Sequence, residues 1–212
     1  MSPERVRPLR ADAQLNQDRL LEAAARAFAR DGSEASLKAI AKDAGVGIGT
    51  LYRRFPTRER LIEATYRNET ARLCAAAPEL LQTSPAAEAL RTWMDLFVDY
   101  MATKHGMADA LHAVLVTEGD LRMQTRDLLT EALATLMAAS AADQTIRPDI
   151  DPNDVLMGLG GVTLIAGEPG QRDLARRLLD LLMDGLKHRG SPDVDAARIV
   201  TAGTPAELPP HP

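Results

Sequence analysis

The sequence predicts an all-α protein of about nine helices, on the basis of two observations. Apolar residues recur three or four positions apart along most of the 212 residues, which is the spacing of an amphipathic helix. Aromatic residues make up only 3% of the chain, and alternating runs of Val, Ile or Thr are absent, so little favours β-strands. Hydrophobic residues at 45% and charged residues at 26% are typical of a soluble globular protein.

The first helix is expected over residues 15–31. It follows a polar segment, residues 1–14, that contains two prolines and is predicted to be a flexible basic arm. Gly32 supplies the C-terminal stop of this helix. A single apolar stripe runs along it, formed by Leu20, Leu21, Ala24, Ala25 and Phe28.

Two short helices are expected next. Ser36 can cap the second helix, which covers residues 37–44 and ends at Gly45. The third begins at residue 47 or 48 and ends near Phe55, because the proline that follows disfavours helical geometry in the residue before it.

The fourth helix is predicted to connect two parts of the molecule. Thr57 can cap it, and we expect it to run from Arg58 to about Ala76, before a break at residues 78–84. Its first turns should pack on the N-terminal helices and its later turns on the C-terminal part.

Five more helices are expected in the C-terminal part. Ser84 as cap and Pro85 as first residue open the fifth helix, and Gly106 ends it. Residues 107–118 and 121–142 form the sixth and seventh.

The last two helices have clear boundary signals. Asp151 and the proline after it predict the start of a helix that runs to about Gly167. The ninth begins near Pro169 and ends at the cationic segment 187–190, and residues 191–212 are expected to be a disordered tail.

The second and third helices together read as a helix-turn-helix. Leu37, Ile40 and Ala41 are expected to face inward, and Leu51 and Phe55 are the expected core anchors of the third helix. In this motif the second member lies in the DNA major groove and its first residues meet base edges. Glycines in that member permit a close approach of the backbone to DNA.

The charge distribution favours the same interpretation. The whole chain has a net charge of −5, yet residues 1–60 carry twelve basic and eight acidic side chains, whereas residues 61–212 carry thirteen and twenty-two. A basic N-terminal part on an acidic body is expected where only one part meets phosphate.

The segment SLKAIAKDAGVGIGTLYRRFPTRERLIEA resembles the DNA-binding signature of the TetR family of transcriptional regulators. Two positions depart from the family pattern: Gly47 replaces a common Ser, and Arg54 replaces a common His. From the residues themselves, Arg53 has the reach for a guanine edge, and Tyr52 and Arg54 can donate to phosphates. With the resemblance, the predicted DNA-binding set is Ser36, Lys38, Gly47, Ile48, Gly49, Thr50, Tyr52, Arg53, Arg54 and Arg58.

The segment WMDLFVDYMATKHGMADAL is similar to the C-terminal domain of SbtR-like members of that family. Methionines and aromatics at helical spacing suit an adaptable apolar pocket for a small-molecule effector, although ordinary core packing explains the same pattern. The predicted pocket residues are Trp93, Met94, Phe97, Tyr100, Met101, Met107, Leu111, His112, Met123 and Met137.

A homodimer is expected, because one short recognition helix makes too few contacts alone. Apolar stripes on the last two helices suit a four-helix seam across a two-fold axis, with packing inside one chain as the alternative. The predicted seam consists of Leu156, Leu159, Val162, Thr163, Leu174, Leu178, Leu181, Leu182 and Gly185.

Composition predicts a flexible basic arm (1–14) and a disordered tail (191–212), and the resemblance implies a helix-turn-helix DNA-binding domain (15–60) and a helical regulatory and dimerisation domain (61–190) between them. We expect a ligand-responsive repressor that binds a palindromic DNA operator as a dimer. The alternatives are a ligand-independent DNA-binding activator or architectural protein and, more distantly, an enzyme with a helical body.

Other classes of site have little support. No Ser/His/Asp or Cys/His constellation is present, so we expect no enzyme and no cofactor. His105 and His112 lack a third ligand at suitable spacing, so no metal site is expected. A single cysteine, Cys74, and the absence of an apolar run of about 20 residues favour a cytoplasmic protein that does not enter the membrane.

Overall fold

A computed structural model describes residues 6–117, 120–167 and 169–187, and regular structure within these ranges is helical. Nine α-helices lie there, so the predicted all-α fold with about nine helices is confirmed. They are α1 (Val6–Asp31), α2 (Leu37–Asp43), α3 (Ile48–Arg54), α4 (Arg58–Thr83), α5 (Ala86–Gly106), α6 (Ala108–Thr117), α7 (Asp120–Ala142), α8 (Pro152–Ala166) and α9 (Arg172–Leu186). The predicted tail lies outside the described residues.

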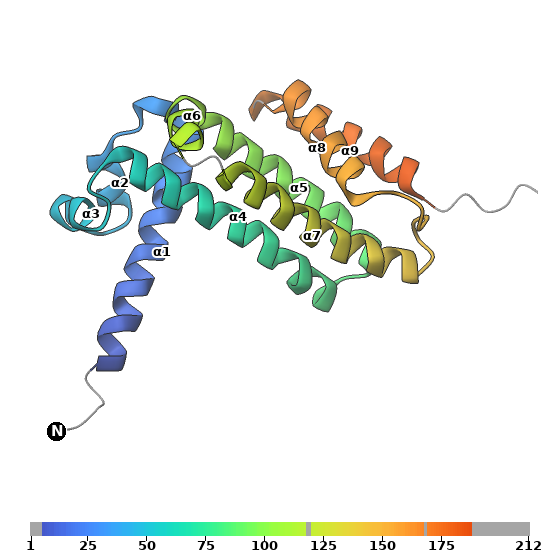
Figure 1. Cartoon of the computed structure of the whole chain (residues 1–212), viewed down its shortest axis with the longest axis horizontal. Helices are drawn as coiled ribbons and strands as arrows, with labels where there is room; N and C mark the ends of the chain where they lie inside the picture. The colour runs from blue at the N-terminus through green and yellow to red at the C-terminus, as the bar shows by residue number, and fades with distance from the viewer. Residues whose placement is uncertain (1–5, 118–119, 168, 188–212) are drawn as a thin grey trace, which may run out of the picture.

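Helices α1, α2 and α3 gather at one end of the molecule, which we call the head, and α4 runs from it along the remaining helices, the body (Figure 1). The core of the head contains Phe28 of α1, Ile40 of α2 and Leu51 of α3, all of which are buried. Leu61 and Ile62, in the first turns of α4, are fully buried against the same core. The predicted packing of the start of α4 on the head is therefore confirmed.

Helix α1 is longer than the sequence indicated. It begins at Val6 rather than at residue 15, so the part of the predicted arm that the structure describes, residues 6–14, is helical. Pro8 lies in the first turn, where the missing N–H has no helical partner to lose, and the following Leu, Arg and Ala are good helix formers. The prediction of a flexible arm was wrong for these residues.

Helix α4 also continues through a predicted break. It extends to Thr83 with Pro78 inside it, rather than ending near Ala76. A proline inside a helix removes one backbone hydrogen bond. Here the alanines and leucines around it are good helix formers, and Ala77 is fully buried, so packing offsets the loss. Ser84 consequently closes α4, and Pro85, not Ser84, is the residue at the N-cap of α5.

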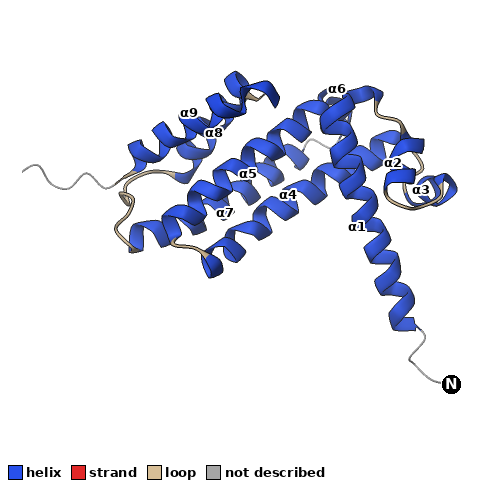
Figure 2. Cartoon of the chain, turned by 180° about the vertical axis from the view of Figure 1, so that it is seen from behind, coloured by secondary structure: helices blue, strands red, loops and turns tan. Residues whose placement is uncertain are grey.

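The body has two layers. Helices α4, α5 and α7 pack together, and α8 and α9 lie side by side on α5 and α7 (Figures 1 and 2). Asp151 caps α8, its carboxylate accepting a hydrogen bond from the backbone N–H of Asn153 at 2.8 Å. Arg91 of α5 donates to Asp180 of α9 at 2.9 Å, which ties the outer pair to the body. No described helix is long and apolar enough to span a membrane.

The head and the body touch backbone to backbone at the end of α5. A Cβ atom placed on Gly106 would lie 2.1 Å from the carbonyl oxygen of Phe28 in α1. The ring of Phe28 lies under the guanidinium of Arg58, 5.4 Å from the ring centroid. Arg58 also donates to the carbonyl of Ala35 at 2.7 Å. Phe28 is thus held between the first residue of α4 and the last residue of α5.

Candidate functional site

The turn between α2 and α3 depends on one glycine. Gly45 adopts a φ of +71°, a left-handed conformation that side chains rarely tolerate. The N–H of Val46 then reaches back to the carbonyl of Ala41 at 2.9 Å. This compact turn places α3 directly after α2, as the helix-turn-helix prediction requires.

Helix α3 has one buried face and one open face. Leu51 is fully buried and Phe55, at the C-terminal end, is buried too, so the predicted core anchors are confirmed. Tyr52 is 49% exposed and Ile48 is 39% exposed, although both are large side chains. A Cβ placed on Gly49 would meet no atom within 4 Å, so the backbone of this face is uncovered.

Exposed cations surround the open face of α3. Lys38, Lys42 and Arg53 are exposed and form no ion pair with any residue that the structure describes. Arg54 donates a hydrogen bond to the side-chain oxygen of Gln17 in α1. These side chains can all reach an anion without first breaking a salt bridge, which lowers the cost of binding phosphate.

Besides Arg54, two predicted DNA-binding residues have structural partners within the head. Ser36 caps α2, with its hydroxyl accepting from the N–H of Ala39 at 3.4 Å. Arg58 is half-buried and engaged with Phe28 and Ala35, as described above. The remaining predicted residues, Lys38, Gly47, Ile48, Gly49, Thr50, Tyr52, Arg53 and Arg54, are exposed together on α2 and α3.

The ten predicted effector residues are all described. Seven are buried in the core of the body: Trp93, Met94, Phe97, Tyr100, Met107, Leu111 and Met137. Met101 is half-buried, His112 is exposed, and Met123 is 69% exposed on α7. Only Tyr100 contributes to the body cleft described next, so core packing accounts for most of this set.

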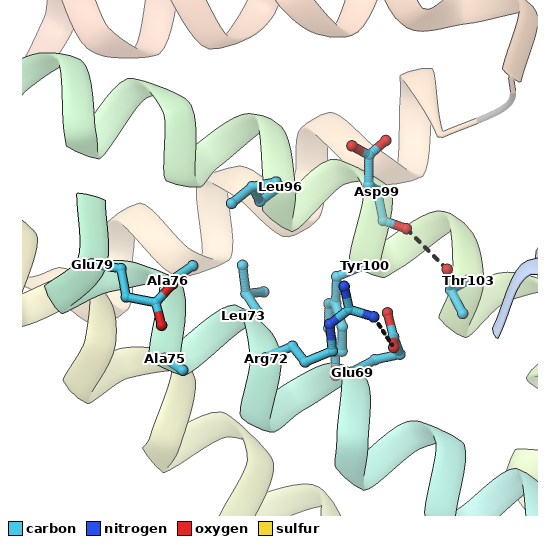
Figure 3. A pocket seen from close by; sticks show the side chains of 10 residues that line it. All are labelled: Glu69, Arg72, Leu73, Ala75, Ala76, Glu79, Leu96, Asp99, Tyr100 and Thr103. Carbon is cyan, nitrogen blue, oxygen red and sulfur yellow. Dashed lines mark hydrogen bonds and ion pairs between the residues drawn. The ribbon is translucent and has the colours of Figure 1, made fainter. Parts of the chain in front are cut away.

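A cleft of about 430 Å³ opens between α4 and α5 (Figure 3). Its apolar surface comes from Leu73, Leu96 and the alanines of α4, and Tyr100 stands behind it. Carboxylates and one guanidinium line the rest of the cleft. The full lining is Glu69, Arg72, Leu73, Ala75, Ala76, Glu79, Leu96, Asp99, Tyr100 and Thr103.

The electrostatics of this α4–α5 cleft are net negative. Arg72 lies 3.6 Å from Glu69, while Asp99 accepts a hydrogen bond from Arg172 of α9 at 2.9 Å. Glu79 has no ion pair with any described residue. Burial raises the pKa of Glu69, because desolvation penalises the carboxylate more than Arg72 favours it. Burial also raises the pKa of the Tyr100 hydroxyl, so this group stays neutral.

A second exposed surface lies on α8 and α9 and is apolar. Leu164 is 82% exposed, Leu181 is 67% exposed, and Met157 and Ile165 are exposed as well. Among the predicted seam residues, Leu181 and Gly185 are exposed, and Val162, Leu174, Leu178 and Leu182 are half-buried. Leu156, Leu159 and Thr163 instead pack inside the chain, which for these three residues is the alternative that the sequence left open.

Sequence reasoning missed several exposed residues. Met157, Leu164 and Ile165 were not predicted for the seam, because α8 is apolar on every side and its periodicity does not select a face. A helix that is apolar on every side has to bury its outer face as well as its inner one, and this property of the sequence could have pointed to the exposed residues of α8. The charged lining of the α4–α5 cleft gave no sequence signal, because Glu69 and Asp99 are thirty positions apart on different helices.

Comparison with known proteins identifies the family. The chain is similar to a TetR transcriptional regulator from Streptomyces coelicolor, with 52% sequence identity over 82% of this chain and 99% of that one, and a TM-score of 0.78. It belongs to the TetR family of transcriptional regulators. A TetR regulatory protein from Mycobacterium vanbaalenii is also similar, with 32% identity over 85% of this chain and 100% of that one, and a TM-score of 0.69.

The two parts of the molecule match two TetR family models. Residues 20–65 match the model of bacterial regulatory proteins of the tetR family, and residues 85–188 match the C-terminal domain of SbtR-like transcriptional regulators. Both resemblances noted in the sequence are confirmed. As a TetR family protein, the chain is a DNA-binding transcriptional regulator, and its helix-turn-helix is the DNA-binding element.

Proposed function

We propose that this TetR family member is a ligand-responsive repressor that binds a palindromic operator as a homodimer. The observation that carries the DNA-binding part is the open face of α3, where Tyr52 and Arg53 stand exposed over a buried Leu51. A helix with this arrangement enters the major groove, with Arg53 at base edges and Tyr52 and Arg54 at phosphates.

The apolar surface of α8 and α9 supports the homodimer. Large exposed hydrophobic side chains in contiguous positions mark a surface that another protein covers. Gly161 and Gly185 on the two helices are exposed, and a Cβ on either would meet no atom of the chain within 4 Å. Small residues of this kind allow a second copy of α8 and α9 to approach closely across a two-fold axis.

The α4–α5 cleft supports the response to a ligand. A volume of about 430 Å³ lies in the range of small-molecule sites. Its net negative lining favours a neutral or cationic effector over an anion. A ligand held between α4 and α5 would shift the position of α4, whose first turns pack on the head, and so change the spacing of the two recognition helices.

DNA binding is tested by selecting bound fragments from random-sequence DNA and measuring affinity for the enriched site across a salt series. Tyr52→Ala and Arg53→Ala are expected to weaken binding. The matched control is Arg122→Ala, which removes an exposed cation from α7, outside the helix-turn-helix, and should leave binding unchanged. Wild-type binding without sequence preference, lost by about 0.2 M salt, would contradict a specific regulator.

The ligand response is tested by thermal-shift screening of a compound library containing cations, neutral compounds and anions. A genuine effector must bind the DNA-free dimer more tightly than the operator complex, by the same factor by which it weakens operator binding. If every compound that binds has the same affinity for the DNA-free protein and for the operator complex, the protein is instead a ligand-independent DNA-binding protein.

A further inference from the structure

Arg54, the last residue of the recognition helix, is held by a neutral partner. Its guanidinium donates a hydrogen bond to the side-chain carbonyl oxygen of Gln17 in α1, and it forms no ion pair with any residue that the structure describes. Two arginines of α4 differ in this respect, because a carboxylate holds both of them. Arg60 lies 2.8 Å and Arg67 3.0 Å from the oxygens of Glu63.

The neutrality of Gln17 matters for DNA binding. A carboxylate at this position would also hold Arg54, but it would cancel the positive charge that attracts a phosphate. An amide oxygen accepts the hydrogen bond without a charge of its own, so the guanidinium keeps its full charge and its other N–H donors. Arg54 is exposed, and these donors can therefore reach a phosphate while the bond to Gln17 is in place.

Gln17 is itself fixed by the core of the head. It is half-buried on α1, one turn before Leu20 and Leu21, of which only 2% and 4% is exposed. An arginine side chain has several rotatable bonds and loses this freedom when it is fixed on a phosphate. A hydrogen bond to a residue that the core already holds removes part of the freedom before DNA binds, which favours binding.

Arg54 lines two grooves of the head, and only one of them holds a carboxylate. The first groove, of about 300 Å³, is also lined by Gln17 and by Thr50 and Arg53 of the recognition helix. The second, of about 440 Å³, lies toward α4 and includes Glu63. Without a partner on α1, the guanidinium would be free to turn toward this carboxylate and be neutralised. The bond to Gln17 keeps it in the first groove.

We propose that Gln17 is a positioning residue for DNA binding, which orients the guanidinium of Arg54 toward an operator phosphate and leaves its charge uncompensated. This inference rests on the proposed contact of Arg54 with phosphate. Gln17 acts through Arg54, so its effect must disappear when the guanidinium is removed. Because a phosphate contact carries no sequence information, Gln17 changes the affinity and leaves the preferred sequence unchanged.

The test compares two substitutions of Gln17 in the full-length protein, with the duplex enriched from random-sequence DNA as the probe. Gln17→Met keeps the length of the side chain and removes the acceptor. We expect a loss of affinity of about 5-fold, the effect of immobilising one long side chain on binding. Gln17→Glu keeps an acceptor and adds a charge that pairs with Arg54. This variant should lose one phosphate contact, so the slope of log affinity against log salt should fall by about 0.9.

A double-mutant cycle with Arg54→Ala separates positioning from a structural role. Gln17→Met should cause no further loss of affinity in the Arg54→Ala protein, and it should leave the melting temperature of the otherwise wild-type protein unchanged. Gln82→Met is the matched control, because it changes an exposed glutamine at the end of α4 away from the head. It should bind the duplex as the wild type does.

The possible failures are distinguishable. Normal binding by Gln17→Met while Arg54→Ala weakens binding would overturn the inference and leave the proposed function intact. A Gln17→Met loss that persists in the Arg54→Ala protein would also overturn it, since Gln17 would then act on the fold or on DNA directly. Wild-type affinity and salt slope in Arg54→Ala would remove the proposed phosphate contact, and the inference with it.

Discussion

Large hydrophobic side chains are exposed both on α3 and on α8 and α9, and their surroundings differ. On α3, Ile48 and Tyr52 stand among exposed cations and glycines of a seven-residue helix. On α8, Leu164 stands near exposed Met157, Gly161 and Ile165, and on α9 Leu181 stands near Gly185 as well as the charged Arg177 and Asp184; each helix has fifteen residues. The first surface belongs to the DNA-binding element of the family, and the second is the one that we propose a second copy of the chain covers.

The largest expected effect comes from breaking the apolar surface. Leu181→Glu would place a pair of like charges close together at a dimer seam, where desolvation and repulsion both oppose association. We expect a monomer that loses operator affinity by about 1000-fold, or about 4 kcal/mol, because one head reads only one half-site. Analytical ultracentrifugation and operator titration measure the two effects.

Leu128→Glu is the control for that change, since Leu128 is 49% exposed on α7, outside the proposed seam. It should leave both the dimer and the affinity intact. A dimeric Leu181→Glu variant with normal operator binding would contradict the assignment of α8 and α9 as the seam.

The next effect concerns the contact that joins the two regions. Gly106→Ala would place a methyl group 2.1 Å from the carbonyl oxygen of Phe28, and backbone cannot rotate away as a side chain does. We expect a loss of about 3 kcal/mol in the free energy of unfolding, measured by denaturant titration. Gly49→Ala meets no atom within 4 Å and should instead stabilise α3 by up to about 1 kcal/mol. Equal stability of the two variants would disprove the close approach of α1 and α5.

A smaller effect sharpens the role of the α3 surface. Arg53→Ala should reduce operator affinity by about 2 kcal/mol and relax the preference at one base pair, because a bidentate contact with guanine is lost. Selection from random DNA with both proteins measures the change. A uniform loss over all sequences, with a lower salt slope, would reassign Arg53 to a phosphate.

The smallest effect is at the α4–α5 cleft. Because burial raises the pKa of Glu69, the ionised carboxylate opposes folding at neutral pH, and this penalty disappears below its ordinary pKa, where both folded and unfolded states are protonated. Glu69→Gln should therefore equal wild type in acid and gain stability, within about 1 kcal/mol, as the pH rises. Melting temperatures at several pH values test this, and a constant difference at all pH values would rule it out.

The sequence was most informative where local geometry determines the structure. Gly45 at a left-handed turn and the apolar pair Leu51 and Phe55 define the helix-turn-helix from a few residues, and these predictions were confirmed. Local signals did not predict the ends of α4 and α1, where packing against other helices or the wider sequence determines the length of the helix. Pro78 reads as a break, but the buried surface of α4 carries the helix through it, and residues 6–14 read as an arm although α1 includes them.

The α4–α5 cleft and the exposed face of α8 were harder to predict for a different reason. The α4–α5 cleft depends on how two helices lie side by side, which the spacing of residues within each helix does not specify. In α8, Leu159 and Leu164 are equally apolar in sequence, yet one is fully buried and the other 82% exposed. Only the packing of α8 on α5 and α7 separates the two.

The glycine at the end of α5 has a mechanical consequence. Where two helices meet through side chains, a small displacement of one helix can be accommodated by a change of rotamers. At Gly106 there is no side chain to rearrange, and the carbonyl of Phe28 rests directly on the helix end. A displacement of the end of α5 toward α1 would therefore have to move the backbone of α1 at Phe28, because no side chain lies between the two to change its rotamer.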